Sequence, residues 1–86
     1  MLPEQLSLCM IMKNEEKVIK RCLDSFQDIV SEIILIDTGS TDRSIEIAKT
    51  YPKVKLFNWE WIDDFSAARN YSFAQATKDW ILWVDL

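Results

Sequence analysis

Two apolar segments, each followed at once by polar residues, limit the folds open to this chain more than any other feature. Residues 6–12 and 33–36 are nearly continuous apolar runs, which is typical of strands buried on both faces of a parallel sheet. Between them, apolar residues recur at helical spacing along residues 18–26, which predicts an amphipathic helix. The order strand, helix, strand predicts a right-handed crossover in a parallel α/β sheet.

The rest of the chain continues this alternation. Residues 43–50 predict a helix that ends before a proline, and the partly alternating segment 53–57 predicts a strand at an edge of the sheet. A further helix is expected over residues 63–76, and the apolar run 80–84 predicts a fourth buried strand. We therefore expect an α/β fold of three layers, with helices on both faces of a parallel sheet of strand order 3-2-1-4. This is the Rossmann-like beginning of a doubly wound sheet.

Composition excludes several kinds of site. The chain has no histidine and one glycine, so it lacks histidine-based catalysis and imidazole metal ligands, and it cannot form a glycine-rich dinucleotide motif or P-loop. Its net charge of −4, with scattered basic residues, argues against nucleic acid as a partner. No apolar run approaches the roughly 20 residues of a transmembrane segment, and no signal pattern precedes the first run. We expect a cytoplasmic location.

Candidate functional residues follow the predicted strands. In the expected strand order, ligands bind at the carboxyl ends of the strands, beside the point where the chain changes direction across the sheet. The carboxylates of Glu15, Asp37 and Asp85 are expected to converge at this edge. Asn14 is expected to cap the helix after the first strand, with Glu15 and Glu16 in its positive first turn.

Asp37 has two interpretations. Its carboxylate could cap the polar turn 38–42, since Asp, Ser and Thr side chains bond to nearby backbone amides. Alternatively, it could accept hydrogen bonds from a base or a sugar, with Gly39 allowing close approach of a ligand. Asp85 occupies the equivalent place on the fourth strand, where a carboxylate could bind a divalent ion or ribose hydroxyls.

The sequence also singles out one arginine and four tryptophans. Arg69 could bind a ligand or pair with Asp63 or Asp64 in the same helix. Trp80 and Trp83 lie in the apolar fourth segment and are expected in the core. Two further tryptophans have no assigned role, Trp59 and Trp61.

Four motifs occur in a specific order across nearly the whole chain. They are Met-Lys-Asn-Glu-Glu at 12–16, Ile-Ile-Leu-Ile-Asp-Thr-Gly-Ser-Thr-Asp at 33–42, Phe-Ser-Ala-Ala-Arg-Asn at 65–70 and Trp-Ile-Leu-Trp-Val-Asp at 80–85. With these motifs the chain resembles the beginning of a family 2 glycosyltransferase with the GT-A fold. The form of the third motif is similar to that of bacterial transferases that sometimes carry tetratricopeptide repeats, although no repeat is present here.

The resemblance implies an inverting enzyme that moves a sugar from a nucleotide donor, commonly a UDP-sugar, to an acceptor hydroxyl with help from Mg²⁺ or Mn²⁺. It implies that residues Met12–Glu15 flank the nucleoside, that Asp37, with Gly39 in its turn, accepts the uracil imide N–H, and that Arg69 approaches the base or the diphosphate. It also implies that Asp85 is the first acid of a D-x-D motif near the ribose and the metal.

The same resemblance bears on domain organisation. Residues 1–86 are expected to form a single partial domain, the N-terminal nucleotide-sugar-binding half of a catalytic domain. The second half of such a domain supplies the acceptor site, a second acid and the catalytic base. We therefore expect no transferase activity from these residues alone, and self-association through the open edge of the fourth strand.

Two alternatives stay open. The chain could be a noncatalytic α/β interaction module whose acidic turns only cap the backbone. It could also be a phosphoacceptor receiver-like domain, but such a domain needs an aspartate at its third strand, where this chain has Phe57 and Asn58. The second alternative is therefore the less favoured.

Overall fold

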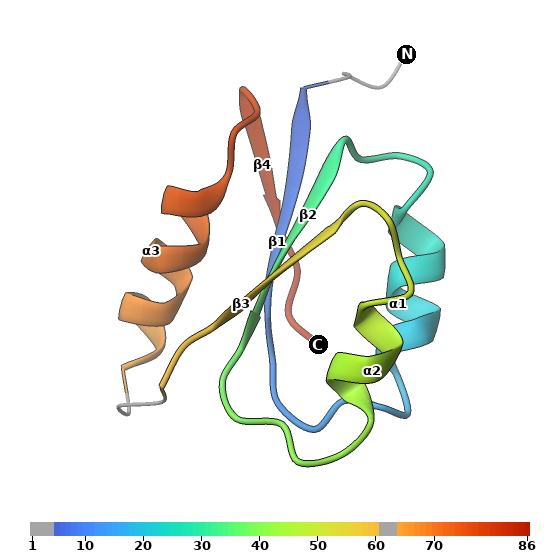
Figure 1. Ribbon diagram of the computed structural model, residues 1–86. Coiled ribbons are helices and arrows are strands. Elements are labelled where there is room, and N and C mark those ends of the chain that lie inside the picture. The colour runs from blue at the N-terminus through green and yellow to red at the C-terminus, as the bar shows by residue number, and fades with distance from the viewer. Residues whose placement is uncertain (1–4, 61–63) are drawn as a thin grey trace.

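The computed structural model describes residues 5–60 and 64–86. Its four strands are parallel and lie in the order β3-β2-β1-β4 (Figure 1), which confirms the predicted topology. The strands are β1 (Leu6–Met12), β2 (Glu32–Asp37), β3 (Val54–Asn58) and β4 (Trp80–Trp83).

Three helices complete the layers. They are α1 (Ile19–Phe26), α2 (Ser44–Ala48) and α3 (Phe65–Gln75). Figure 1 shows α1 and α2 together on one face of the sheet and α3 on the other, so the predicted arrangement of three layers is confirmed. None of the helices within the described ranges is long and apolar enough to cross a membrane.

The core is divided by the sheet into two parts, because successive side chains of a strand point to opposite faces. On the α1 and α2 face, Leu8, Met10, Ile33 and Leu35 pack with Leu23 of α1. On the α3 face, Cys9, Ile34 and Ile36 pack under aromatic side chains from β3, α3 and β4. Both central strands are therefore covered on both sides, as their apolar runs predict.

β4 differs from the prediction of a buried strand. Trp80 is 65% exposed and Ile81 is 43% exposed, so Trp80 is not a core residue. Trp83 is half-buried and packs edge-on against Phe73. The reason is position: among the described strands, β4 pairs with β1 alone, and the ring contacts from α3 are made to Trp83, at the end of β4. Apolar composition predicted the strand but could not predict this exposure.

The beginning of α1 also differs from the prediction. The helix begins at Ile19, its N-cap residue is Val18, and no side chain caps it. Asn14 therefore does not cap α1, and no acidic residue lies in its first turn. The prediction failed because Asn14 bonds to another loop, as described below.

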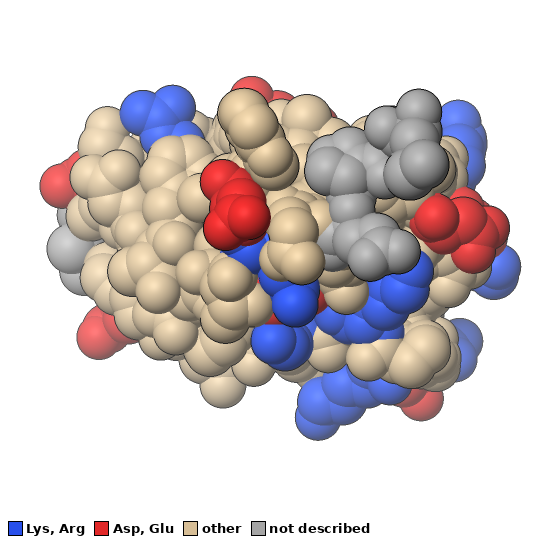
Figure 2. Space-filling view, turned by 90° about the horizontal axis from the view of Figure 1, so that it is seen from above, with Lys and Arg blue, Asp and Glu red and all other residues tan. Residues whose placement is uncertain are grey.

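A buried carboxylate lies at the amino ends of the strands, which the sequence did not indicate. Glu32 is 2% exposed, and its oxygens accept hydrogen bonds from Ser7 Oγ at 2.6 Å, Lys55 Nζ at 2.7 Å and the Thr77 amide at 2.7 Å. The end of the molecule where the strands begin carries basic side chains near its middle (Figure 2). Burial disfavours ionisation of Glu32, but the hydrogen bonds from Lys55, Ser7 and Thr77 outweigh it and lower its pKa to about 2.

Candidate functional site

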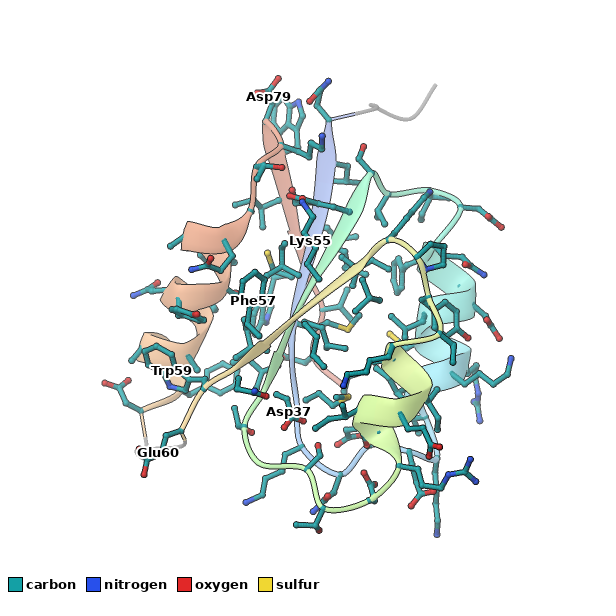
Figure 3. The ribbon with its side chains drawn as sticks, in the orientation of Figure 1. Asp37, Lys55, Phe57, Trp59, Glu60 and Asp79 are labelled. Atoms are coloured by element: carbon teal, nitrogen blue, oxygen red, sulfur yellow. The ribbon has the colours of Figure 1, made fainter. Side chains whose placement is uncertain are left out.

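The carboxyl ends of the strands carry most of the residues selected from the sequence. Figure 3 shows Asp37 at this end of the sheet, with Trp59 and Glu60 on the segment that leaves β3, whereas Lys55 and Asp79 lie toward the opposite end. Because the strands are parallel, the segments that follow β1, β2 and β3 all emerge at this edge. The edge is therefore where a ligand site is expected in such a sheet.

Asp37, the last residue of β2, organises the turn that follows it. One of its carboxylate oxygens, Oδ2, accepts the amides of Gly39 at 3.1 Å and Ser40 at 3.0 Å. The other, Oδ1, accepts the Ser40 hydroxyl. Asp37 is 3% exposed, and this is the capping arrangement of the first interpretation. A carboxylate oxygen can accept about two hydrogen bonds, so Oδ1 keeps capacity for one more.

Gly39 has a backbone conformation that other residues rarely adopt. Its φ is +115°, and a Cβ added there would meet no atom within 4 Å. Glycine is therefore required by backbone conformation and not by crowding within the chain. The absence of a side chain leaves open space beside the Asp37 turn.

A hollow of about 380 Å³ lies next to this turn and is lined by Asp37, Thr38, Gly39, Asn58, Trp59 and Glu60. The Trp59 ring packs on Tyr71 of α3 with their centroids 4.6 Å apart, and the Trp59 amide donates to the Asp37 carbonyl at 2.9 Å. The hollow is therefore bounded on one side by the polar turn and on the other by an aromatic residue that α3 supports.

A second hollow of about 240 Å³ shares Thr38 with the first and is lined by Ile11, Lys13, Thr38 and Phe65. Arg69 lies near it, because its guanidinium carbon is 5.9 Å from the centroid of the Phe65 ring and 6.0 Å from that of Trp83. Asp64 accepts the Ala67 amide at 3.0 Å and so caps α3. No described residue forms an ion pair with Arg69, and Asp63 lies outside the described residues.

Met12 and Asn14, both predicted to flank the nucleoside, have different surroundings. The Met12 side chain is fully buried in the core on the α1 side, so it is not presented at the surface where a ligand would bind. Asn14 lies in the left-handed region with φ 53°, and its Oδ1 accepts the backbone amides of Thr41 at 2.7 Å and Asp42 at 3.2 Å. Asn14 thus connects the loop after β1 with the loop after β2.

Glu15 and Asp85 line a third hollow of about 320 Å³, together with residues of α1 and Leu86. Asp85 is exposed, and its Oδ1 accepts the indole N–H of Trp83 at 3.0 Å. Glu15, Asp37 and Asp85 therefore lie at the same edge of the sheet, as predicted, but Asp37 lines a separate hollow beside its own turn. No three acidic or cysteine side chains within residues 5–60 and 64–86 could hold a metal ion together. The donor set does not fit a metal by itself, since Asp85 offers one hard oxygen ligand.

The whole arrangement corresponds to a known family. A family model described as glycosyl transferase family 2 matches residues 7–86. The chain belongs to glycosyl transferase family 2. This confirms the resemblance inferred from the four motifs, which lie within the matched residues.

Two curated relatives of this family 2 chain have much greater length. The TPR repeat-containing protein of Synechococcus elongatus is 53% identical over 81 residues, which are 94% of this chain and 20% of that protein. The SPbeta prophage-derived glycosyltransferase SunS of Bacillus subtilis is 43% identical over 76 residues, which are 87% of this chain and 18% of that protein. The chain thus spans about a fifth of the length of these two relatives.

Solved structures show the same fold. Glucosyl-3-phosphoglycerate synthase from Mycobacterium tuberculosis matches with a TM-score of 0.80 at 22% identity, over 95% of this chain and 33% of that one. That structure is a complex with Mn²⁺, UDP and glucosyl-3-phosphoglycerate, and another of the same enzyme holds Mn²⁺, UDP-glucose and phosphoglyceric acid. The likeness confirms the predicted GT-A fold for this family 2 chain.

Proposed function

We propose that this chain is the donor-binding part of an inverting glycosyltransferase that moves a sugar from a UDP-sugar to an acceptor hydroxyl. The observation that carries the proposal is the hollow of about 380 Å³ beside the Asp37 turn, at the carboxyl ends of β2 and β3. Nucleotides bind at this edge in open α/β sheets. Membership of family 2 supports the proposal, as do the UDP and UDP-glucose held by the mycobacterial synthase.

Asp37 would recognise the base through a hydrogen-bond acceptor position that its own turn leaves unused. Oδ2 accepts two amides and Oδ1 accepts one hydroxyl, so one further donor can approach Oδ1. The uracil imide N–H is such a donor. Cytosine has an acceptor nitrogen at the same ring position, and it would face the carboxylate without a proton between them. A site built to accept a hydrogen bond from its ligand rejects a similar ligand that lacks the donor, so UDP is favoured over CDP.

Arg69 and Lys13 supply positive charge beside the second hollow. The Arg69 guanidinium has no ion pair with a described residue, and Lys13 lines that hollow. Arginine donates in a fork that matches phosphate oxygens. We assign both side chains to the diphosphate of the donor.

Asp85 and Glu15 would complete the donor site on the ribose side, where carboxylates accept hydroxyl hydrogen bonds. The Mn²⁺ in the mycobacterial synthase supports a divalent ion, Mg²⁺ or Mn²⁺, as the cofactor of the whole enzyme. Asp85 would give one oxygen ligand, and the remaining ligands would come from outside the described residues. The catalytic base and the acceptor site are likewise assigned to other parts of the enzyme, so we expect no transfer by these 86 residues alone.

Nuclear magnetic resonance titration of the ¹⁵N-labelled chain with UDP and CDP, each with Mg²⁺, tests the proposal. We expect UDP to shift the amide signals of Thr38, Gly39 and Asn58, and to bind about tenfold or more tightly than CDP. The Asp37→Asn variant is the decisive comparison. An asparagine can keep its oxygen toward the two turn amides, which places its NH₂ group where Oδ1 lies now.

The NH₂ group that Asp37→Asn introduces would repel the uracil N–H and suit the cytosine nitrogen, so the preference for UDP should be lost or reversed. Asp28→Asn is the matched control, because Asp28 is exposed in the segment between the end of α1 and the beginning of β2, and β2 carries Asp37 at its other end. Unchanged selectivity in Asp37→Asn would reject the role of Asp37. Absence of any shift in the hollow with either nucleotide would reject donor binding and favour the noncatalytic interaction module.

A further inference from the structure

Three consecutive amides in the loop after β1 are held by the loop after β2 and by the first residue of α2. The Asn14 amide donates to Ser40 Oγ at 3.0 Å, the Glu15 amide to Ser44 Oγ at 2.7 Å, and the Glu16 amide to Asp42 Oδ2 at 3.2 Å. Successive amides can point to one side when a residue in the run has a left-handed conformation. Asn14 has that conformation, with φ 53°.

The Asn14 side chain closes the same connection in the opposite direction. Its Oδ1 accepts the amides of Thr41 and Asp42 and lies 3.4 Å from the Thr41 hydroxyl. Asparagine is one of the few residues besides glycine that tolerate positive φ. Asn14 therefore supplies both the backbone bend and the acceptor that the opposite loop requires.

The Ser40 side chain links this connection between the two loops to Asp37. Ser40 Oγ accepts the Asn14 amide and donates to Asp37 Oδ1. The Ser40 hydroxyl proton is therefore directed at the carboxylate, because the Asn14 amide can only donate and the ionised carboxylate can only accept. The Asp37 oxygen that is assigned to base recognition thus has its orientation fixed from the loop after β1.

We propose that Asn14 is a positioning residue for base recognition, which acts through Ser40 on Asp37 Oδ1 and does not touch the donor. The inference rests on the proposed function, because it concerns how accurately Asp37 Oδ1 directs its unused hydrogen-bond acceptor position toward the base. When the Asn14 contacts are lost, the Asp37 turn keeps its own amides but its Oδ1 is no longer held in one direction. Discrimination between uracil and cytosine then decreases.

Two substitutions at Asn14 separate its backbone role from its side-chain role. Asn14→Gly keeps access to positive φ and removes the amide oxygen, whereas Asn14→Asp keeps an oxygen acceptor and tolerates the same φ. The measured quantity is the ratio of the dissociation constants for CDP and UDP, each with Mg²⁺, at a temperature where circular dichroism shows every variant to be folded. A general loss of stability changes both constants together and leaves this ratio unchanged.

Asn14→Gly keeps the backbone amide that donates to Ser40 Oγ but loses the oxygen that accepts the Thr41 and Asp42 amides, so the loop that carries Ser40 is held less firmly. We expect this variant to lower the ratio about tenfold, and Asn14→Asp to restore it to within about twofold of the parent chain. Ser40→Ala removes the relay while Asn14 stays in place, and it should lower the ratio similarly. Ala74→Gly is the control, since this exposed residue near the far end of α3 loses helix propensity without touching either loop.

The outcomes distinguish the two proposals. If Asp37→Asn abolishes the preference for UDP while Asn14→Gly and Ser40→Ala keep it, the positioning role is rejected and the proposed function stands. If the parent chain binds UDP and CDP equally, base recognition by Asp37 is rejected, and the positioning role with it. If Ala74→Gly lowers the ratio as much as Asn14→Gly does, the effect follows from stability alone and the positioning role is also rejected.

Discussion

Glu32 accepts two hydrogen bonds from Thr77, from its amide at 2.7 Å and from its hydroxyl at 3.0 Å. This pair joins the first residue of β2 to the link between α3 and β4, 45 positions later in the chain. Ser7 of β1 and Lys55 of β3 complete the set. One buried side chain thus bonds to both neighbouring strands and to the segment that leads into β4.

Glu32→Gln should destabilise the chain by about 2–4 kcal/mol, because an NH₂ group replaces one acceptor and leaves a buried donor unpaired. Urea denaturation followed by circular dichroism measures the change. Glu46→Gln is the matched control, since Glu46 pairs with Arg43 on the surface, where their side chains are 67% and 71% exposed, and it should change stability little. Equal losses in the two variants would contradict the structural role of Glu32.

Stability should also depend on pH through Glu32. Its pKa is lowered from 4.5 to about 2, so its contribution is fully present above about pH 5 and is lost as the pH falls toward 2. The loss should reach about 3 kcal/mol, at roughly 1.4 kcal/mol for each pKa unit. Hydrogen bonds also lower the pKa of Asp24 and of Asp42, so these groups act in the same direction. The difference between the parent chain and Glu32→Gln, measured by urea denaturation at pH 3 and pH 6, isolates Glu32.

Gly39→Ala should destabilise the chain by about 1–2 kcal/mol. An L-residue at a φ of +115° is strained, and the open space around the position leaves conformation as the main cause. Denaturant unfolding measures the change. A neutral result would show that the turn can adopt a negative φ without loss.

The edge of β4 should cause self-association of the chain. The amides of Trp80 and Val84 bond to Gln5 and Cys9, so the intervening amide of Ile81 points away from β1 in a parallel pairing. Ile81 is 43% exposed, and such edges pair with other strands. Sedimentation should show association that increases with concentration, and Ile81→Lys should prevent it.

Ile29→Lys provides the comparison for that experiment. Ile29 is also exposed, at 36%, but it lies in the segment after α1 and not in β4. This variant should associate as the parent chain does. A parent chain that remains monomeric at high concentration would contradict pairing through β4.

The fold was predictable because each strand has a local signal. The apolar runs and the polar turns after them predicted the four parallel strands, and Asp64 predicted the beginning of α3, where it caps the helix. Burial of β4 was not predictable, since an apolar run does not indicate whether a strand has one neighbour or two. The exposure of Trp80 is the result.

The candidate site was predictable in part. The sequence indicated Asp37 and Gly39, because a carboxylate and the single glycine follow a buried strand. It did not indicate that Asn14 bonds across to Thr41, because a helix cap and a loop connection use the same residue type. Glu32 was missed because its partners Ser7, Lys55 and Thr77 are far apart in sequence, and only the sheet brings them together.

The connection between the two loops has a thermodynamic consequence. Loops normally lose conformational entropy when a ligand orders them, and this loss reduces affinity. Here the amides of Asn14, Glu15 and Glu16 have their hydrogen-bond acceptors within the protein, in the side chains of Ser40, Ser44 and Asp42. A ligand that enters beside Asp37 therefore meets a preorganised rim, and little of its binding free energy is spent on ordering the protein.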